Sequence, residues 1–326
     1  MRIVFALLLV AVLAVGGWLA WAIYAPVTPP GQTFVMLRPG FSTKRIAREL
    51  QSAGVIHNAQ AFLLWHYLHS KNSLKAGEYA FSKTADAREI HSRLTRGDVY
   101  VRTVVIPEGY NIFDVAQAIQ NAGLGSAQDF LKVAMSETAL ISDLDPGAKT
   151  LEGYLFPNTY EFTRTLSMHD MAAAMVRQFR QVAQQIGLNS DVAKAVIMGS
   201  IIEKETSAPE ERPLVASVYY NRLAKHIALQ ADPSVIYGEL LQGTYTGALH
   251  HADMKSKSPY NTYLYPGLPP GPIANPGKTS LEAALHPAVT DYYYFVSNGD
   301  GHHRFAHSFE EHSKNVAKFR KVAFRR

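Results

Sequence analysis

The feature that most constrains this chain is an uncharged apolar run near its N-terminus. Residues 3–24, IVFALLLVAVLAVGGWLAWAIY, contain no charged side chain. As a helix the run is roughly 30 Å long, which matches the hydrocarbon thickness of a bilayer. Trp18, Trp21 and Tyr24 cluster at its distal end, where the aromatic belt of a membrane interface is expected. The run therefore predicts a single membrane-spanning helix.

The distribution of basic residues predicts the orientation of this helix. Arg2 and the amino terminus precede the run, and the next basic residue is Arg38. This asymmetry places residues 1–2 in the cytoplasm and the rest of the chain across the membrane. The alternative is a cleaved signal peptide, since AWA at 20–22 resembles a small-x-small cleavage site. Both interpretations export the protein, and APVTPPGQ at 25–32 then forms a stiff, extended linker.

The amino-acid composition limits the kinds of partner and chemistry that can be expected. The 326 residues are 47% hydrophobic, enough for a sizeable core and two domains beyond the anchor. The net charge of +5 suits a polyanion, an anionic membrane or a cell-wall polymer. Nucleic acid is not expected as a partner, because the one dense basic stretch is the tail KFRKVAFRR, which also reads as a solvated helix face. The absence of cysteine excludes disulfides, thiol catalysis and thiolate metal sites.

Two segments of the N-terminal half resemble each other. RPGFSTKRIARELQSAGV at 38–55 aligns with PEGYNIFDVAQAIQNAGL at 107–124. Each follows a short β-like run, continues at helical spacing and stops at a glycine, and each precedes a second helix starting near an AQ-x-F motif. Chance similarity of two helix starts is the alternative to duplication. The aligned positions are Gly40 with Gly109, Phe41 with Tyr110, Ile46 with Val115, Ala47 with Ala116, Leu50 with Ile119, and Gly54 with Gly123.

The C-terminal half changes in residue composition along its length. Helical patterns come first, and Pro-, Gly-, Asn- and Tyr-rich stretches follow, which we expect to form long ordered loops and short strands around a groove. The fold class predicted is therefore α+β, with the duplicated region at 33–160 and a second domain at 161–326. The expected helices are 168–188, 191–206 with a cap at Asn189 or Ser190, 209–226 and 308–323, and the expected strand is 292–298.

One helix end raises a chemical question. The segment GSIIEKET at 199–206 closes an apolar helix with Glu203 and Glu205. On a helix, Glu205 follows the apolar stripe of Ile201, Ile202 and Met198. Burial and the negative helix end both favour a protonated carboxyl, as a general acid requires. A solvated helix end is the alternative. Glu203 is expected to make a supporting contact or a surface pair with Lys204 or Arg212.

The loops carry polar and aromatic side chains of the kinds that bind sugars, although such residues in Pro-rich loops can also be structural. Asp232 is a rival second carboxylate, but Asp before Pro also indicates a turn or helix cap. The paired histidines at 250–251 and 302–303, with His307, do not have secured metal-ligand spacing, so no metal and no cofactor is expected. The predicted substrate-binding residues are Gln230, Asp232, Tyr237, Tyr260, Asn261, Thr262, Tyr263 and His303.

These motifs resemble a known family. GSIIEKET, ASVYYNRL, LQADPSVIYG, SPYNTYLYPGLPPGPIANPG, ALHPA and YYYFVSNGDGHHRF occur in the order found in the endolytic murein transglycosylases, the YceG-like family. The resemblance covers essentially the whole chain, including the N-terminal anchor and a LysM-like module at 33–160. It implies that Glu205, the second glutamate of Glu-Lys-Glu-Thr, is the catalytic acid. The resemblance implies no role for His307.

The resemblance also implies the reaction and the location. The substrate would be the glycan strand of peptidoglycan, cleaved between N-acetylmuramic acid and N-acetylglucosamine to leave 1,6-anhydro ends. The enzyme would sit in the bacterial inner membrane by a single pass, with its catalytic domain periplasmic, and act on nascent strands beside cell-wall synthases. Two alternatives stay open: a hydrolytic muramidase with Asp232 as second carboxylate, and a non-enzymatic, membrane-tethered peptidoglycan-binding module.

Overall fold

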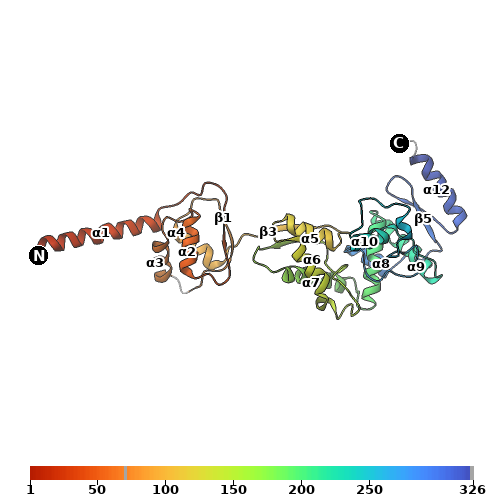
Figure 1. Cartoon of the computed structure of the whole chain (residues 1–326), viewed down its shortest axis with the longest axis horizontal. Coiled ribbons are helices and arrows are strands. Elements are labelled where there is room, and N and C mark those ends of the chain that lie inside the picture. The colour runs from red at the N-terminus through yellow and green to blue at the C-terminus, as the bar shows by residue number, and fades with distance from the viewer. Residues whose placement is uncertain (70–71, 324–326) are drawn as a thin grey trace. The chain divides into compact units, whose positions relative to one another are not determined.

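The structure is a computed structural model that describes residues 1–69 and 72–323, and it divides the chain into two compact units (Figure 1). The first unit comprises Met1–Thr103 and Glu161–Leu166, and the second comprises Val104–Tyr160 and Ser167–Arg326. The chain passes from the first unit to the second along strand β3 and returns briefly along β4, which pairs with β3. Each unit is described by itself below.

The first unit starts with the predicted apolar helix. This helix, α1, has a mean hydropathy of 2.7 and is the one helix among the described residues that is long and apolar enough to cross a membrane. After it in the chain, a two-stranded antiparallel sheet of β1 and β2 packs against three helices around Val35, Leu37 and Tyr79. The elements are α1 (Arg2–Tyr24), β1 (Thr33–Leu37), α2 (Thr43–Ser52), α3 (Ala59–His69), β2 (Gly77–Phe81) and α4 (Ala87–Arg96).

Segment 25–32 is held along the first unit. Val27 forms a β-bridge with Ala85, and the hydroxyl groups of Thr28 and Thr84 are hydrogen-bonded at 2.8 Å. The segment is extended, as its prolines predict, but it is attached at two points instead of running free between the anchor and the unit.

The second unit is mainly helical. Helices α9, α10 and α11 pack against α8, and a short hairpin of β5 and β6 packs beside α12 near the C-terminal end of the described chain (Figure 1). Together with the first unit this confirms the α+β class. The elements from β3 on are β3 (Arg102–Ile106), α5 (Ile112–Asn121), α6 (Ala127–Ser136), β4 (Asn158–Phe162), α7 (Met168–Gln185), α8 (Val192–Glu205), α9 (Arg212–Ala224), α10 (Asp232–Gln242), α11 (Lys278–Leu285), β5 (Tyr294–Ser297), β6 (His303–Ala306) and α12 (Phe309–Ala323).

The two similar segments have the same order of elements. Each is strand, helix, helix, strand: β1-α2-α3-β2 in the first unit and β3-α5-α6-β4 in the second. Gly40 and Gly109 open the two copies with φ of 85° and 77°, a left-handed conformation that favours glycine. The boundary between the units falls between the copies, whereas the sequence grouped both in 33–160. The duplication and its LysM-like character stay predictions.

Two local expectations were wrong. Asp191, not Asn189 or Ser190, precedes α8; its φ is 50°, and it makes no capping hydrogen bond. The region after 226 contains the helices α10 and α11, where the sequence suggested loops and short strands. Pro233 lies in the first turn of α10, where its missing N–H has no helical partner to lose. A proline near a helix start was therefore misread as a sign of irregular structure. The end of the basic tail, 324–326, lies outside the described residues.

Candidate active site

Helix α8 carries Glu205 at its C-terminal end and is buried along most of its length. The small residues Gly199 and Ser200 let it pack closely. A Cβ on Gly199 would stand 3.2 Å from Leu281 of α11. The buried Ser200 hydroxyl donates to the Ile197 carbonyl at 2.7 Å and accepts from the Ile273 amide at 3.0 Å. Packing on both sides therefore fixes the direction in which the helix ends.

Glu203 makes the supporting contact that the sequence predicted. Its Oε1 accepts a hydrogen bond from Arg212 at 2.9 Å, and its Oε2 accepts from the Gly277 amide at 2.9 Å. Both partners of the ion pair are almost fully buried, at 6% and 7% side-chain exposure. This pair joins the end of α8 to the start of α9 and to the loop that precedes α11.

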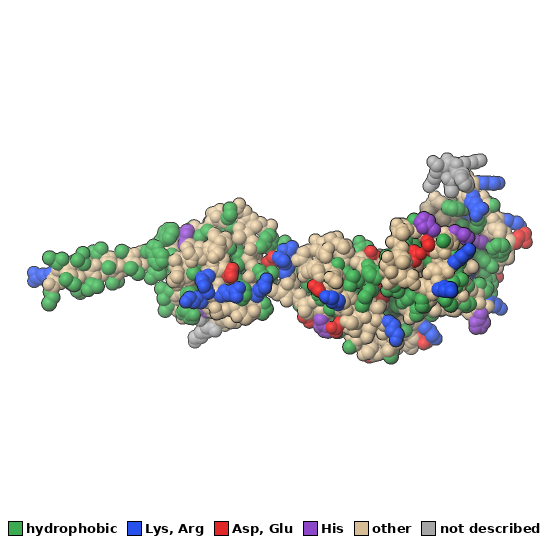
Figure 2. Space-filling model, in the orientation of Figure 1, with side chains coloured by type: hydrophobic (Ala, Val, Ile, Leu, Met, Phe, Trp, Pro, Cys, Tyr) green, Lys and Arg blue, Asp and Glu red, His purple; other side chains and the backbone are tan. Residues whose placement is uncertain are grey.

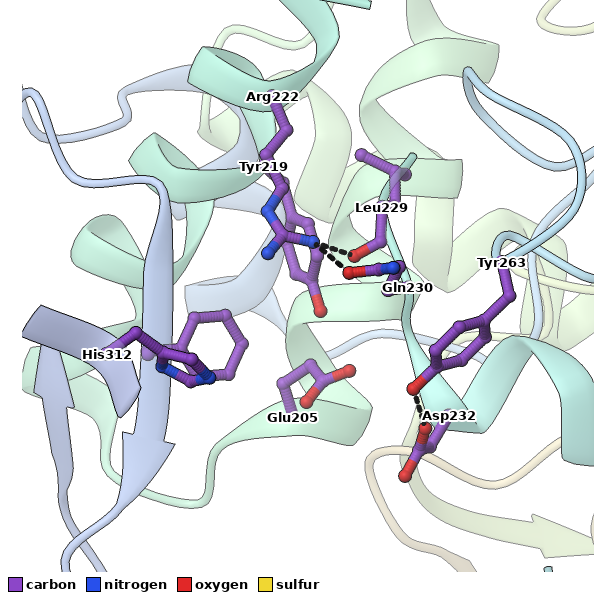
Figure 3. A pocket seen from close by; sticks show the side chains of 9 residues that line it. Glu205, Tyr219, Arg222, Leu229, Gln230, Asp232, Tyr263 and His312 are labelled. Atoms are coloured by element: carbon purple, nitrogen blue, oxygen red, sulfur yellow. Dashed lines mark hydrogen bonds between the residues drawn. The ribbon is translucent and has the colours of Figure 1, made fainter. Parts of the chain in front are cut away.

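Glu205 faces a separate cavity of about 270 Å³. Six parts of the second unit meet there: the end of α8, helix α9, the segment leading into α10 with the first residue of that helix, the loop that carries Tyr263, strand β5 and helix α12 (Figure 3). The Glu205 carboxyl lies between the His312 side and the Asp232 side of the cavity. The lining residues are Glu205, Tyr219, Arg222, Leu229, Gln230, Asp232, Tyr263, Phe295 and His312.

The surroundings of Glu205 favour its protonated form. Burial raises the pKa of its carboxyl to about 7, and the negative charge of Asp232 acts in the same direction. The Tyr219 hydroxyl, which points toward Glu205 in Figure 3, and the Arg222 guanidinium oppose this rise. Burial also raises the pKa of Tyr219 well above its usual value, so this side chain stays a hydroxyl. At neutral pH Glu205 can therefore both donate and accept a proton.

Arg222 organises one wall of the cavity. Its guanidinium donates to the Tyr293 carbonyl at 2.7 Å, to the Leu229 carbonyl at 2.8 Å and to the Gln230 side chain at 3.3 Å. Gln230 has a left-handed backbone with φ of 56°, which turns the chain into the segment before α10. Arg222 thus connects α9, the approach to β5 and the backbone beside Glu205.

Asp232 lies across the cavity from Glu205 and is exposed. It is the first residue of α10, and the Tyr263 hydroxyl donates a hydrogen bond to its Oδ1 (Figure 3). Of the eight predicted substrate-binding residues, the cavity brings together Gln230, Asp232 and Tyr263.

Two more predicted residues lie buried beside the site. Thr262 accepts from the Ala231 amide at 2.9 Å, and its hydroxyl shares a hydrogen bond with Ser234 at 2.9 Å. Asn261 donates to the carbonyls of Met254 and Ser256 at 3.0 and 2.7 Å. At 1% and 0% exposure, these side chains hold the loop that presents Tyr263.

The remaining three predicted residues are also outside the cavity. Tyr237 is buried, with its hydroxyl hydrogen-bonded to Glu152, and its ring packs edge-on against Tyr260 at 5.1 Å. His303 pairs with Glu211, Nδ1 to Oε2, at 2.7 Å. Its ring also contacts Phe295, a cavity residue, at a centroid distance of 5.3 Å. Within residues 1–69 and 72–323, no three His, Cys, Asp or Glu side chains are placed to hold a metal ion.

Sequence reasoning did not single out five lining residues: Tyr219, Arg222, Leu229, Phe295 and His312. Tyr219 and Arg222 are three positions apart in ASVYYNRL, hence on one helix face, so their spacing was a usable signal. Phe295 and His312 come from the last hairpin and helix. Only the tertiary fold brings them to Glu205, and no local pattern indicates this.

Comparisons with known proteins agree on one group. The model of the YceG-like family matches residues 35–318. A protein of Bacillus subtilis named endolytic murein transglycosylase is 34% identical over 317 residues, covering 90% of this chain and 87% of its own length. A Streptococcus pneumoniae protein of the same name is 28% identical, and the match covers 95% of this chain but 64% of that protein. The crystal structure of a protein described as yceG-like from Listeria monocytogenes superposes with a TM-score of 0.58 at 34% identity, covering 87% of this chain and 98% of that one.

Proposed function

Since this chain belongs to the YceG-like family, we propose that it is a membrane-anchored endolytic lytic transglycosylase that cleaves peptidoglycan glycan strands. The names of the Bacillus subtilis and Streptococcus pneumoniae relatives support this activity. The observation that carries the proposal is the setting of Glu205, a single carboxyl with a pKa near 7 in a cavity lined by polar and aromatic side chains.

The chemistry needs one acid and no water. Protonated Glu205 donates its proton to the glycosidic oxygen between N-acetylmuramic acid and N-acetylglucosamine, and the bond from muramoyl C1 to that oxygen breaks. The muramoyl 6-hydroxyl then bonds to C1, and its proton passes to the Glu205 carboxylate. The products are a 1,6-anhydro end and a free 4-hydroxyl, and Glu205 is protonated again. A pKa of about 7 suits a residue that acts first as acid and then as base.

Asp232 shapes the site and is not a second catalytic carboxylate in this proposal. A retaining or inverting glycosidase uses two carboxyl groups on opposite sides of the scissile bond. Asp232 is instead engaged by the Tyr263 hydroxyl at the start of α10. Its negative charge helps to keep Glu205 protonated. Gln230 and Tyr263 supply amide and hydroxyl groups toward the sugar.

The cavity takes only part of the polymer. Its volume of about 270 Å³ is at the lower end of the roughly 300–1,000 Å³ of small-ligand sites. We therefore assign it to the sugar at the scissile bond, while Tyr237, Tyr260, Asn261 and Thr262 support its walls. His303 supports it through Phe295. The LysM-like strand-helix-helix-strand copies add contacts to the glycan away from the cavity.

The chain is anchored in this proposal by α1 in the bacterial inner membrane, with the N-terminus cytoplasmic and both units periplasmic. The uncharged run 3–24 within the 23-residue helix supports an anchor, and Arg2 with the amino terminus at its start supports the orientation. A tethered enzyme of this kind meets strands as they leave the synthases, so nascent glycan is the proposed substrate and cell-wall synthases are proposed partners.

The test compares the full-length chain and its Glu205→Gln variant, both in detergent, on purified peptidoglycan, with product ends read by mass spectrometry. The proposal expects anhydro ends, lighter by one water than reducing ends, that disappear in the variant. Reducing ends would instead indicate a muramidase and direct attention to Asp232. An active Glu205→Gln variant would remove Glu205 from the chemistry, and binding without cleavage by the folded wild type would favour a binding module.

A further inference from the structure

Helix α3 of the first unit has an apolar face that none of the described residues of that unit covers. Phe62 and His66 point into the core, and Ala61 and Trp65 pack against the end of α1. On the remaining face, three positions related by helical spacing are exposed: Leu64 at 39%, Tyr67 at 69% and Leu68 at 69%. Large apolar side chains gathered on one exposed helix face indicate an interaction surface. We call Leu64, Tyr67 and Leu68 the α3 face.

The position of this face relative to α1 indicates what covers it. Ala22 and Ile23 of α1 are buried against Ala61 of α3, with Leu19 and Trp65 packed around them. Figure 1 shows α3 beside the end of α1 at which the chain enters the first unit. Figure 2 shows hydrophobic side chains continuing from α1 onto this part of the unit.

The depth of α3 follows from the aromatic residues of α1. Trp18, Trp21 and Tyr24 are about half-exposed, and in an anchored helix they mark the level of the lipid headgroups. The residues of α1 that contact α3 lie between Leu19 and Ile23, within the same turns. Helix α3 is therefore held at the interface and not out in the aqueous phase.

A paired charge lies at the same level. The Arg88 guanidinium lies 4.5 Å from the centre of the Tyr24 ring, and it is bound to the Asp86 carboxylate at 2.6 Å. Its charge is therefore compensated within the first unit, and the surface is defined by the apolar side chains of the α3 face. A helix with an apolar face at this level has the character of one that lies in a membrane interface.

We propose that the α3 face inserts into the outer surface of the membrane that α1 crosses, so that lipid covers Leu64, Tyr67 and Leu68. The inference rests on the proposed anchor and adds a second membrane contact to it. With α1 packed on α3, this second contact fixes the tilt of the first unit on the bilayer.

The absence of cysteine allows a direct test with single-cysteine variants of the full-length chain. An environment-sensitive fluorophore is attached at Leu68→Cys, at Phe34→Cys or at Leu13→Cys. The chain is reconstituted in vesicles of phosphatidylethanolamine and phosphatidylglycerol that contain lipids with quenchers at defined depths. Phe34 is the matched control, because it is 42% exposed on β1, on the other side of the first unit from α1 (Figure 1). Leu13 reports on the anchor itself.

The proposal expects the Leu68 probe to be quenched by shallow lipid quenchers and to be several-fold less accessible to aqueous iodide than the Phe34 probe. A Leu13 probe quenched at the bilayer centre, beside a Leu68 probe that behaves like Phe34, would overturn the α3 insertion and leave the anchor intact. A Leu13 probe without lipid quenching would overturn both. A Leu68 probe shielded from iodide but not quenched by lipid would indicate a protein partner and overturn the proposal.

A variant that introduces negative charge on the α3 face checks that this face is responsible for the lipid quenching. Leu64→Glu with Leu68→Glu should abolish lipid quenching of a probe at Tyr67→Cys while the Leu13 probe is unchanged. Both leucines are exposed, so the fold should persist, and circular dichroism checks this. Undiminished quenching at Tyr67 in this variant would contradict the insertion.

Discussion

Glu203 and Glu205 leave the end of α8 in different directions and have opposite electrostatic surroundings. Glu203 is bound to the Arg212 guanidinium at 2.9 Å and to the Gly277 amide at 2.9 Å, so its negative charge is compensated. Glu205 has no ion pair within the described chain, and burial raises its pKa to about 7. In the proposed function, two glutamates separated by one lysine thus divide support and chemistry between them.

The first prediction follows from this division. Glu205→Gln should lower kcat by about 10²–10⁴, the usual contribution of a general acid, with little change in Tm. Glu203→Gln should instead destabilise the fold by about 3 kcal/mol, because the buried Arg212 loses its closest carboxylate and keeps only the half-exposed Glu108, at 3.7 Å. Calorimetry and single-turnover kinetics on both variants separate the two effects. Equal losses of activity and stability in the two variants would contradict the division.

The second prediction concerns pH. Because Glu205 must be protonated to act, kcat/KM should fall about tenfold per pH unit above its pKa of about 7. Asp232→Asn removes a charge that raises this pKa, so the alkaline limb should move to lower pH. Tyr219→Phe removes a hydrogen bond that lowers it, so the limb should move to higher pH. Profiles measured on soluble glycan fragments check the two directions, and a common shift in both variants would refute the assignment.

The third prediction concerns a residue with a supporting role. Thr262→Val leaves the buried Ala231 amide without its acceptor and removes one of the two hydrogen bonds of the Ser234 hydroxyl, and it should cost about 1–3 kcal/mol of stability. Thr262→Ser keeps the hydroxyl and is the matched control. Since Thr262 lies outside the cavity, KM for the folded fraction should change little in either variant. A large rise in KM without loss of stability would mean that Thr262 touches substrate.

The fourth prediction concerns His312. Burial lowers the pKa of its imidazole, so the ring is neutral at pH 7. Among the described residues, none hydrogen-bonds its buried Nδ1. Because the ring lines the cavity, we expect it to contact the substrate, so His312→Ala should raise KM several-fold with a smaller change in kcat. His307→Ala, at an exposed histidine outside the cavity, is the control. Equal KM values in the two variants would exclude the contact.

The sequence predicted the parts of this fold that depend on local pattern. The apolar period of 191–206 placed α8 and its terminal glutamates correctly, and the uncharged run of 3–24 corresponds to α1. The prediction of secondary structure failed where proline and glycine are frequent. Pro233 was interpreted as a sign of a loop, although it lies in the first turn of α10. The sequence also could not tell that Asn261 and Thr262 are buried while Tyr263, the next residue, reaches the cavity. Their order in the chain is uninformative, since tertiary packing decides which side chain faces inward.

Only those site residues that a pattern within one segment indicates could be predicted. Glu205 was identified from its own helix, whereas Phe295 and His312 become neighbours of Glu205 through contacts between distant segments. Residues of that kind are visible only once the chain is folded.

The late position of His312 in the chain has a consequence for the timing of activity. If the chain is threaded through the membrane while α1 stays there as its anchor, Glu205 and Asp232 emerge before β5 and α12 do. A chain whose export stops before residue 312 therefore presents Glu205 in an unfinished cavity, without the wall that Phe295 and His312 provide. In the proposed function, cleavage of the glycan strands then begins only after complete translocation. A stalled or truncated chain leaves the peptidoglycan around it uncut.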